Sequence, residues 1–206
     1  MIPIRQKVGI FGGAFDPPHN AHVALAQTAI SELALDTLHV IPTGHAWHKD
    51  RTLSAAQDRL AMTRLAFQNT TRVVVDDREI KRAGPTFTID TLQALQAENP
   101  DAQLYLIMGA DQFAAFKQWH QWREILQIAI ICIAHRASFE GATGQLDPLK
   151  GGQGRALMLQ MPPMAVSATR IRQLLAGGLS ENHRVVDLLP NPVASYIAQH
   201  QLYKAS

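Results

Sequence analysis

The chain of 206 residues is 47% hydrophobic and 17% charged, and its formal net charge is +2. These values are ordinary for a globular domain that buries one continuous core. The small excess of Lys and Arg is spread along the chain, so the sequence gives no case for a nucleic-acid partner.

Cysteine content and apolar run length indicate the compartment. The one cysteine, Cys132, lies in the apolar run IAIICIA and is predicted to be a small buried hydrophobe, which excludes a disulfide framework and a cysteine-based metal site. The first residues, MIPIRQK, lack the apolar region of a signal peptide, and no stretch approaches the length of a membrane span. We therefore expect a cytoplasmic protein with no membrane partner.

Short apolar runs alternate with stretches of helical periodicity along the chain. Strands are predicted at residues 7–11, 37–42, 72–76, 103–109, 129–134 and 155–161. Helices are predicted at residues 21–33, 54–67, 88–98, 111–116, 122–127, 167–178 and 191–200. The strand runs are apolar almost throughout, which indicates burial on both faces of a parallel sheet. The element order predicts an α/β fold, a Rossmann-like doubly wound parallel sheet flanked by helices, in a single domain over residues 1–206 whose C-terminal part, from about residue 165, is helical.

Polar segments follow four of the predicted strands at their carboxyl ends. They are GGAFDPPHNAH, PTGHAWHK, DDREIKRAGPTFT and GADQ. Because ligands of doubly wound sheets bind outside the carboxyl ends of the strands, these segments are predicted to share one site. A further segment, from Ser138 to Gly154, is rich in glycine and polar residues and is predicted to be a mobile surface loop.

The stretch KVGIFGGAFDPPHNAH leaves a predicted strand through two glycines and enters a helix with two histidines. Gly12 and Gly13 allow close backbone approach to a ligand, and the first turn of the helix offers free N–H groups to a phosphate. His19 and His22 can donate hydrogen bonds to phosphate oxygens. The alternative is a glycine turn followed by ordinary surface histidines. The dinucleotide pattern G-x-G-x-x-G is absent and no second motif completes a zinc site, so no metal ligand is predicted.

A second candidate, MAVSATRIRQLLAGG, lies near the C-terminus at residues 164–178. Ser167 is a good N-cap for a helix that two glycines end. Arg170 and Arg172 lie in the first turns, where cations oppose the helix dipole, so they indicate an anion nearby. The alternative is a pair of solvated surface arginines.

Together the two motifs resemble a known signature. GGAFDPPHNAH resembles the GGxFxPxHxGH element of the nucleotidyltransferases related to class I tRNA synthetases, and VSATRIR, about 150 residues further on, resembles their ISSTxIR element. Other segments resemble the bacterial nicotinate-nucleotide adenylyltransferases, so the resemblance covers nearly the whole chain. They are IP with HK at 41–49, DDREIKRAGPTFTIDTL, GADQF, FKQWH at 116–120 and LLPNPVASYIAQHQLY. The chain departs from the signature at Ala21, in place of a glycine, and at Ala168, in place of a serine.

The resemblance implies transfer of the adenylyl group of ATP to nicotinate mononucleotide, which gives deamido-NAD and pyrophosphate in NAD biosynthesis. The partners would be these two small molecules. Because the mononucleotide phosphate is already a nucleophile, no catalytic base is required, and the enzyme must align two phosphates and neutralise developing charge. The resemblance implies Mg²⁺ as a cofactor, held mainly by ATP phosphates and water.

The resemblance also implies roles for individual residues. The residues implied in catalysis are His19, His22 and Arg172. The residues implied in binding ATP and its phosphates are Gly12, Gly13, Phe15, His48, Lys49, Gly109, Asp111, Ser167 and Thr169. The residues implied in binding nicotinate are Thr88, Trp119 and His120, with backbone N–H groups at the carboxylate and the indole stacked on the pyridine ring.

Several residues keep an alternative interpretation. Asp111 either lies near the ribose of the adenylate or caps the helix that it begins. Trp47 and Trp122 are expected to be packing or loop residues. A basic run after the third strand is expected to be a solvated loop, with phosphate attraction as the alternative. It consists of Arg78, Lys81 and Arg82.

The acceptor and the class of protein also keep alternatives. Nicotinamide mononucleotide or phosphopantetheine would be the acceptor in other branches of the superfamily, and residues 116–120 argue against the latter. A non-catalytic nucleotide-binding module is the alternative outside the enzymes. It would be favoured if His19, His22 or Arg172 were missing, and all three are present.

Overall fold

The computed structural model describes residues 5–44, 53–135, 156–162, 164–177, 185 and 187–204. In these residues six strands form one parallel sheet in the order β3-β2-β1-β4-β5-β6. The strands are β1 (Lys7–Gly13), β2 (Thr37–Pro42), β3 (Val73–Val75), β4 (Gln103–Gly109), β5 (Ala129–His135) and β6 (Ala156–Gln160). The helices are α1 (Asn20–Leu33), α2 (Ala56–Phe67), α3 (Arg78–Lys81), α4 (Thr88–Glu98), α5 (Ala110–Ala114), the 3-10 helix η1 (Phe116–Gln118), α6 (Trp122–Ile128), α7 (Ala168–Ala176) and α9 (Asn191–Gln199). None of the described helices is long and apolar enough to cross a membrane.

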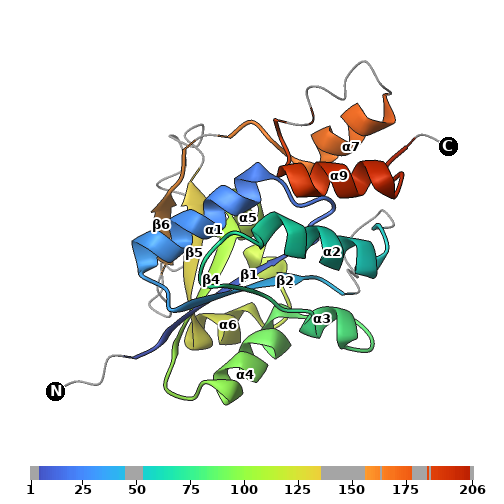
Figure 1. The fold of residues 1–206 in the computed structure, drawn as a ribbon. Coiled ribbons are helices and arrows are strands. Elements are labelled where there is room, and N and C mark those ends of the chain that lie inside the picture. Colours follow the sequence, from blue (N-terminus) through green and yellow to red (C-terminus); the bar gives the residue numbers. More distant parts are fainter. Residues whose placement is uncertain are drawn as a thin grey trace.

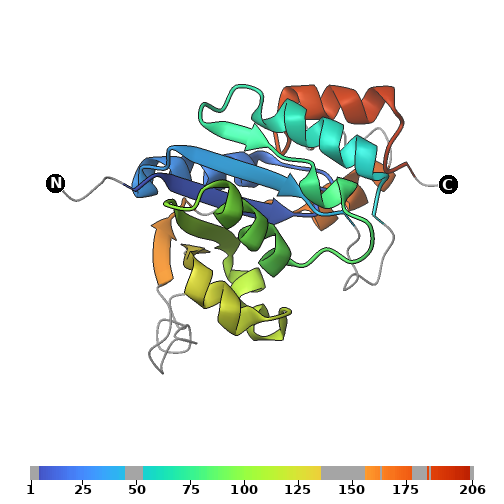
Figure 2. The same ribbon diagram turned by 90° about the horizontal axis from the view of Figure 1, so that it is seen from below.

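Helices cover both faces of the sheet (Figure 1). Helices α1 and α2 lie on one face, with α7 and α9 beside them, and α4 and α6 lie on the other, as the second view also shows (Figure 2). Each face has its own hydrophobic cluster, and consecutive residues of β1, such as Ile10 and Phe11, belong to different clusters. Cys132 is buried in β5, as predicted, and burial raises the pKa of its thiol to about 12. The predicted burial of both faces is confirmed for the central strands β1, β2, β4 and β5, whereas the edge strands β3 and β6 expose Val74, Leu157 and Met158.

The strand order places a topological switch between β1 and β4. From β1 the chain moves outward through β2 to β3, and then crosses to β4 on the other side of β1. At such a switch the connections leave in opposite directions, and the crevice outside the carboxyl ends of the two strands is where ligands of this fold bind. The predicted doubly wound parallel sheet is therefore confirmed, and the glycine-rich motif begins at its crevice.

Strand β1 is longer than the sequence predicts. The apolar run ends at Phe11, whereas the strand continues through Gly12 and Gly13, which align with Ile41 and Pro42 of β2. Pairing of strands needs only backbone groups, so glycines at a strand end can pair without an apolar side chain. The two glycines therefore belong to the end of the strand, and the turn begins after them.

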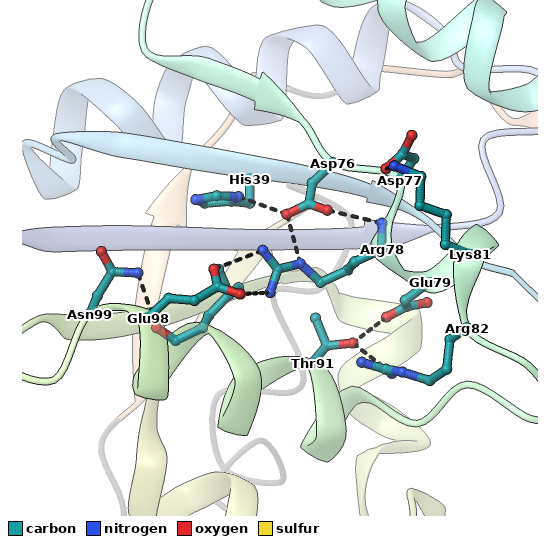
Figure 3. Close-up of polar contacts among 11 residues, drawn as sticks. His39, Asp76, Asp77, Arg78, Glu79, Lys81, Arg82, Thr91, Glu98 and Asn99 are labelled. Atoms are coloured by element: carbon teal, nitrogen blue, oxygen red, sulfur yellow. Dashed lines mark hydrogen bonds and ion pairs between the residues drawn. The ribbon is translucent and has the colours of Figure 1, made fainter.

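Arg78, the first residue of the basic run after β3, does not lie in a solvated loop (Figure 3). Its first part forms α3, a single helical turn too short to show periodicity in the sequence. Arg78 donates from Nε to Asp76 at 2.7 Å, and its two Nη atoms donate to the two carboxylate oxygens of Glu98 at 3.0 Å each. Nδ1 of His39 on β2 lies 3.1 Å from the same carboxylate of Asp76. Arg78 therefore links Asp76, which follows β3 and contacts His39 of β2, to Glu98 of α4, and the solvated-loop prediction is wrong for Arg78.

Asp76 is expected to stabilise the fold in a pH-dependent way. Burial by itself would raise its pKa, but hydrogen bonds with His39 and with the backbone and side chain of Arg78 lower the pKa from 3.8 to about 2. A carboxyl group whose pKa is lower in the folded state stabilises the fold above its unfolded pKa, and this contribution is lost as the pH falls through the folded pKa. We predict that Asp76→Asn lowers the free energy of unfolding by about 2 kcal/mol at pH 7.

Urea denaturation at a series of pH values checks this prediction. The difference between wild type and Asp76→Asn should shrink as the pH falls from 3.8 towards 2, the interval between the unfolded and folded pKa values. Asp101→Asn, at an exposed position, is the matched control and should leave the curve unchanged. A loss of stability that is the same at neutral and acid pH would contradict the assignment.

Candidate active site

Glycines lie near the carboxyl ends of β1 and β4, where ligands of doubly wound sheets bind. Gly12 lies near the end of β1 and Gly109 ends β4. A Cβ built at either position would meet no atom within 4 Å, so the space beside both strand ends is open. A Cβ at Gly13 would approach the ring of Phe15 to 3.1 Å, which is tighter than ordinary packing. Backbone at Gly12 and Gly109 therefore has room for the close approach of a ligand, whereas the Phe15 ring fills the space beside Gly13.

The loop after β1 turns sharply at Phe15. This residue has a φ of 47°, in the left-handed region that bulky side chains rarely adopt, and the peptide bond between Asp16 and Pro17 is cis. Phe15 as a whole is 2% exposed, and its ring packs edge-on against Phe11 and His22, with centroid distances of 5.4 and 5.0 Å. Because the ring is packed in this aromatic cluster, the side chain of Phe15 is not placed to contact a ligand.

The two predicted histidines lie together at the start of α1. His19 is the N-cap residue, and its backbone N–H donates to Nδ1 of His22 at 3.2 Å. The two imidazole rings stack with a centroid distance of 3.6 Å and an interplanar angle of 13°. The hydrogen bond requires a lone pair on Nδ1 of His22, so the ring proton of that residue lies on Nε2. Nε2 is then the atom of His22 that can donate to a ligand. Ala21, which replaces the glycine of the motif, packs against the core of this face.

Helix α7 brings the second motif to the same loop. Ser167 is its N-cap, as predicted, and the hydroxyl oxygen accepts the backbone N–H of Arg170 at 3.2 Å. Arg172 donates from Nη1 to the carbonyl oxygen of Asp16 at 2.7 Å and from Nη2 to Oγ1 of Thr169 at 3.1 Å. Arg170 is exposed. Of the two arginines, the structure therefore places Arg172 at the loop before the histidines. Arg172 and its partner Asp16 are 156 residues apart in sequence.

Asp16 anchors this loop to the C-terminal part of the chain. The residue is 1% exposed, and Tyr203 donates its hydroxyl to Oδ1 at 2.6 Å. Burial raises the pKa of Tyr203, and the hydrogen bond to Asp16 raises it further. Sequence reasoning did not single out either residue. The only signal was indirect, because Asp16 stands inside the first motif and Tyr203 inside the C-terminal segment of the resemblance.

The three residues predicted to bind nicotinate lie on two neighbouring segments. Thr88 is the first residue of α4, and Phe87 is its N-cap. The ring of His120 lies against the ring of Phe87, with a centroid distance of 4.4 Å. Trp119 is half-buried and packs against Phe116 at 5.6 Å. The structure thus brings the segment of Trp119 and His120 to the N-terminus of α4, through a phenylalanine that sequence reasoning missed.

Other predicted residues have mixed outcomes. Asp111 lies in the first turn of α5 and is not its cap, because the helix begins one residue earlier and Gly109 is the N-cap. The capping interpretation of Asp111 is therefore wrong, and its place near the end of β4 stays compatible with a ribose contact. Trp122 packs against Phe116 at 6.2 Å, as expected. The remaining predictions fall outside the described residues. They concern Trp47, His48, Lys49 and the loop from Ser138 to Gly154.

A cavity of about 570 Å³ lies beside the chain that follows β2. The described residues that line it are Gly44, Ala56, Ile80, Arg82, Gly84 and Pro85. A Cβ at Gly44 would collide with the carbonyl oxygen of Glu79, so the chain after β2 lies directly against α3. Arg82 is the member of the basic run that faces this cavity.

Comparison with known proteins places this architecture in a class. Residues 10–174 match the model of the cytidylyltransferase-like family, so the fold and the two motifs define a nucleotidyltransferase. The fold superimposes on Plasmodium falciparum nicotinic acid mononucleotide adenylyltransferase complexed with NaAD, with a TM-score of 0.80 and 20% identity over 97% of this chain and 98% of that chain. A probable nicotinate-nucleotide adenylyltransferase of Albidiferax ferrireducens is 51% identical over 98% of this chain and 100% of its own length. A protein of the same description from Methylibium petroleiphilum is 40% identical over 97% of this chain and 93% of its own length.

The chain belongs to the family of nicotinate-nucleotide adenylyltransferases. The family and the enzyme class predicted from the motifs are confirmed, and a non-catalytic binding module is no longer favoured. The roles of individual residues stay predictions, which the geometry above makes specific.

Proposed function

We propose that the protein transfers the adenylyl group of ATP to nicotinate mononucleotide at the site outside the carboxyl ends of β1 and β4, as the family name indicates. The phosphate oxygen of the mononucleotide attacks the α-phosphorus of ATP, and the bond from that phosphorus to the bridging oxygen of the β-phosphate breaks. The products are deamido-NAD and pyrophosphate. The nucleophile is already ionised, so the chemistry needs alignment and charge neutralisation and no catalytic base. The observation that carries the proposal is the convergence of the stacked histidines and Arg172 on one loop.

Donors from two distant segments would neutralise the phosphates. His22 would donate from Nε2, because the N–H of His19 occupies Nδ1. Arg172 would hold the departing pyrophosphate, since a planar guanidinium binds phosphate oxygens through several N–H groups. Preorganised donors of this kind act most strongly where charge develops in the transition state. Further contacts are proposed from the backbone of Gly12, Gly13 and Phe15 and from the hydroxyls of Ser167 and Thr169.

The nucleoside end of ATP would lie towards β4. Gly109 leaves open space at the end of this strand, and Asp111 follows it in the first turn of α5. A carboxylate there can accept hydrogen bonds from ribose hydroxyls. We also keep His48 and Lys49 as proposed phosphate contacts, on the strength of the sequence resemblance alone.

Magnesium is proposed to arrive with the nucleotide. Within the described part of the chain, no group of three or more His, Cys, Asp or Glu side chains lies where it could hold a metal ion. Mg²⁺ commonly keeps several waters and binds through substrate phosphates with few protein ligands. The donor set at the crevice, made of imidazoles, a guanidinium and backbone N–H groups, suits the phosphates of a Mg²⁺-bound nucleotide better than it suits the ion itself. The ion would neutralise phosphate charge.

The acceptor pocket is proposed at the N-terminus of α4. The backbone N–H of Thr88 lies at the first position of the helix, where N–H groups have no partner within the helix. An N–H donor there, with another near His120, suits a carboxylate, which only accepts hydrogen bonds. An amide would turn its NH₂ group against one of these donors. Trp119 would stack on the pyridine ring.

Both substrates are ordinary constituents of cytoplasm, and the free Cys132 suits a reducing compartment, so cytoplasm is the proposed location.

We predict that nicotinate mononucleotide is used at least about tenfold better than nicotinamide mononucleotide, because each mispaired buried donor costs about 1–3 kcal/mol. The measurement is kcat/KM for the two acceptors at fixed ATP, followed by pyrophosphate release. Trp119→Ala should raise the KM for the acceptor, and Trp119→Phe, which keeps an aromatic face, should restore much of the loss. Equal use of the two acceptors by the wild type would refute the carboxylate pocket. An unchanged KM in Trp119→Ala would remove the stacking role alone.

A further inference from the structure

Arg59 of α2 is buried beneath the loops that form the rim of the site. The residue is 2% exposed, although arginine is rarely buried to this extent unless its donors are satisfied. Nε donates to the carbonyl oxygen of Ser54 at 3.0 Å, Nη1 to that of Ala14 at 3.0 Å, and Nη2 to that of Gly44 at 3.3 Å. One side chain thus contacts the backbone of three separate segments.

Two of these segments carry predicted site residues. Ala14 lies in the loop after β1, between the glycines and the histidine pair, and Gly44 lies in the chain after β2. The third, Ser54, is held from its other side as well, because its backbone N–H donates to Oδ2 of Asp16 at 3.4 Å. The carbonyl oxygen of Asp16 in turn accepts Arg172. Arg59 is therefore connected to the first motif through the carbonyl of Ala14, and to Arg172 of the second through Ser54 and Asp16.

The contact with Ala14 also sets the direction of a neighbouring N–H. In a planar trans peptide the C=O and the N–H point in opposite directions. Because the carbonyl of Ala14 points at the buried guanidinium, the N–H of Phe15 points away from it. When a carbonyl points at a buried cation, the N–H end of the same peptide, which is the positive end of its dipole, points the other way. At the peptide between Ala14 and Phe15 this orientation favours an anion on the side of the loop opposite Arg59.

We propose that Arg59 is a positioning residue of the adenylyl-transfer site. It holds the loop after β1 in the shape that presents the His19–His22 pair and the N–H of Phe15 to the phosphates of ATP, and it does not itself touch the substrate. Only a guanidinium has the planar fork of donors that reaches three carbonyls, so lysine cannot replace it in this role. This inference rests on the proposed function of the crevice.

The test compares Arg59→Lys with Arg64→Lys on the same helix. Arg64 has a 58% exposed side chain that pairs with Asp77 at 3.5 Å, which makes it the matched control. We expect Arg59→Lys to lower kcat at least about tenfold with little change in KM for nicotinate mononucleotide, because small misplacements of reacting groups cost rate. Arg64→Lys should behave as wild type. Rates are compared at a temperature at which circular dichroism shows each variant folded, and Arg59→Gln, which keeps one amide donor, is the second variant.

A double-mutant cycle separates positioning from general stability. If Arg59 acts through the histidine-bearing loop, Arg59→Lys should cost less than about threefold further in a His22→Ala background. The same loss in both backgrounds, or full activity of folded Arg59→Lys, would overturn the inference. A wild type that forms no deamido-NAD would instead contradict the proposed function. A wild type that forms it, with Arg59→Lys and Arg64→Lys equally active, would contradict only the role of Arg59.

Discussion

Replacement of His22 by alanine is expected to lower kcat about a hundredfold, which corresponds to about 3 kcal/mol of lost transition-state stabilisation. The KM for ATP should change far less, because a donor that meets charge developing in the transition state acts on kcat. The structure makes the reason specific: the N–H of His19 holds Nδ1 of His22 at 3.2 Å, so Nε2 carries the proton that can meet a phosphate oxygen. Initial rates over a range of ATP concentrations measure both constants.

Other histidine variants control this result. His19→Ala should behave like His22→Ala, since the two rings stack at 3.6 Å and begin the same helix. His200→Ala should leave the rate unchanged, because that imidazole is exposed at the end of α9 and stacks on Tyr196 at 4.0 Å. Turnover of His22→Ala close to that of wild type would remove the histidine pair from the mechanism.

Arg172→Ala is expected to weaken the use of pyrophosphate in the reverse reaction by about tenfold or more, and the use of deamido-NAD much less. A hydrogen bond to a charged group is worth about 1.5–3 kcal/mol, and a guanidinium offers several such bonds to pyrophosphate. Deamido-NAD is the other substrate of the reverse reaction. Its two phosphates form the bridge between its nucleosides and are not free pyrophosphate, so its binding depends less on the Arg172 side chain. The reverse reaction, followed by formation of ATP, gives a KM for each substrate.

Arg170→Ala is the matched control for this arginine. Arg170 is exposed, and it contributes its backbone N–H to the cap of α7, which alanine retains. Arg172, in contrast, already reaches the loop after β1 through the carbonyl of Asp16. A damaging Arg170→Ala with a silent Arg172→Ala would mean that the other face of α7 meets the nucleotide.

The sheet and much of the site were predictable because their signals are local. Continuous apolar strands indicated a parallel sheet, and the end of such a sheet is where ligands bind. Gly12, Gly13 and the two histidines lie within one short stretch, and Ser167 marks the start of α7 by ordinary capping chemistry. Local chemistry of this kind needs no knowledge of the tertiary structure.

The parts of the site that the sequence did not predict depend on contacts with backbone groups or between residues far apart in the chain. In the sequence Arg59 is one more charged residue of a predicted helix, and its partners are carbonyl oxygens, which every residue has. The hydrogen bond from Tyr203 to Asp16 joins residues 187 positions apart, and no spacing rule predicts it. Helix α3 was not predicted from the sequence because a single turn has no periodicity. The predicted start of α5 was one residue late because Gly109 is a permissive cap.

A crystal structure of the protein with a non-hydrolysable ATP analogue and nicotinate mononucleotide would test the assignment of the β1–β4 crevice most directly. We predict a phosphate oxygen within about 3 Å of Nε2 of His22, the distance of a hydrogen bond, and contacts from Arg172 to the terminal phosphates. The nicotinate carboxylate should lie at the backbone N–H of Thr88. A triphosphate bound away from the carboxyl ends of β1 and β4, or a nicotinate ring far from the start of α4, would contradict this assignment.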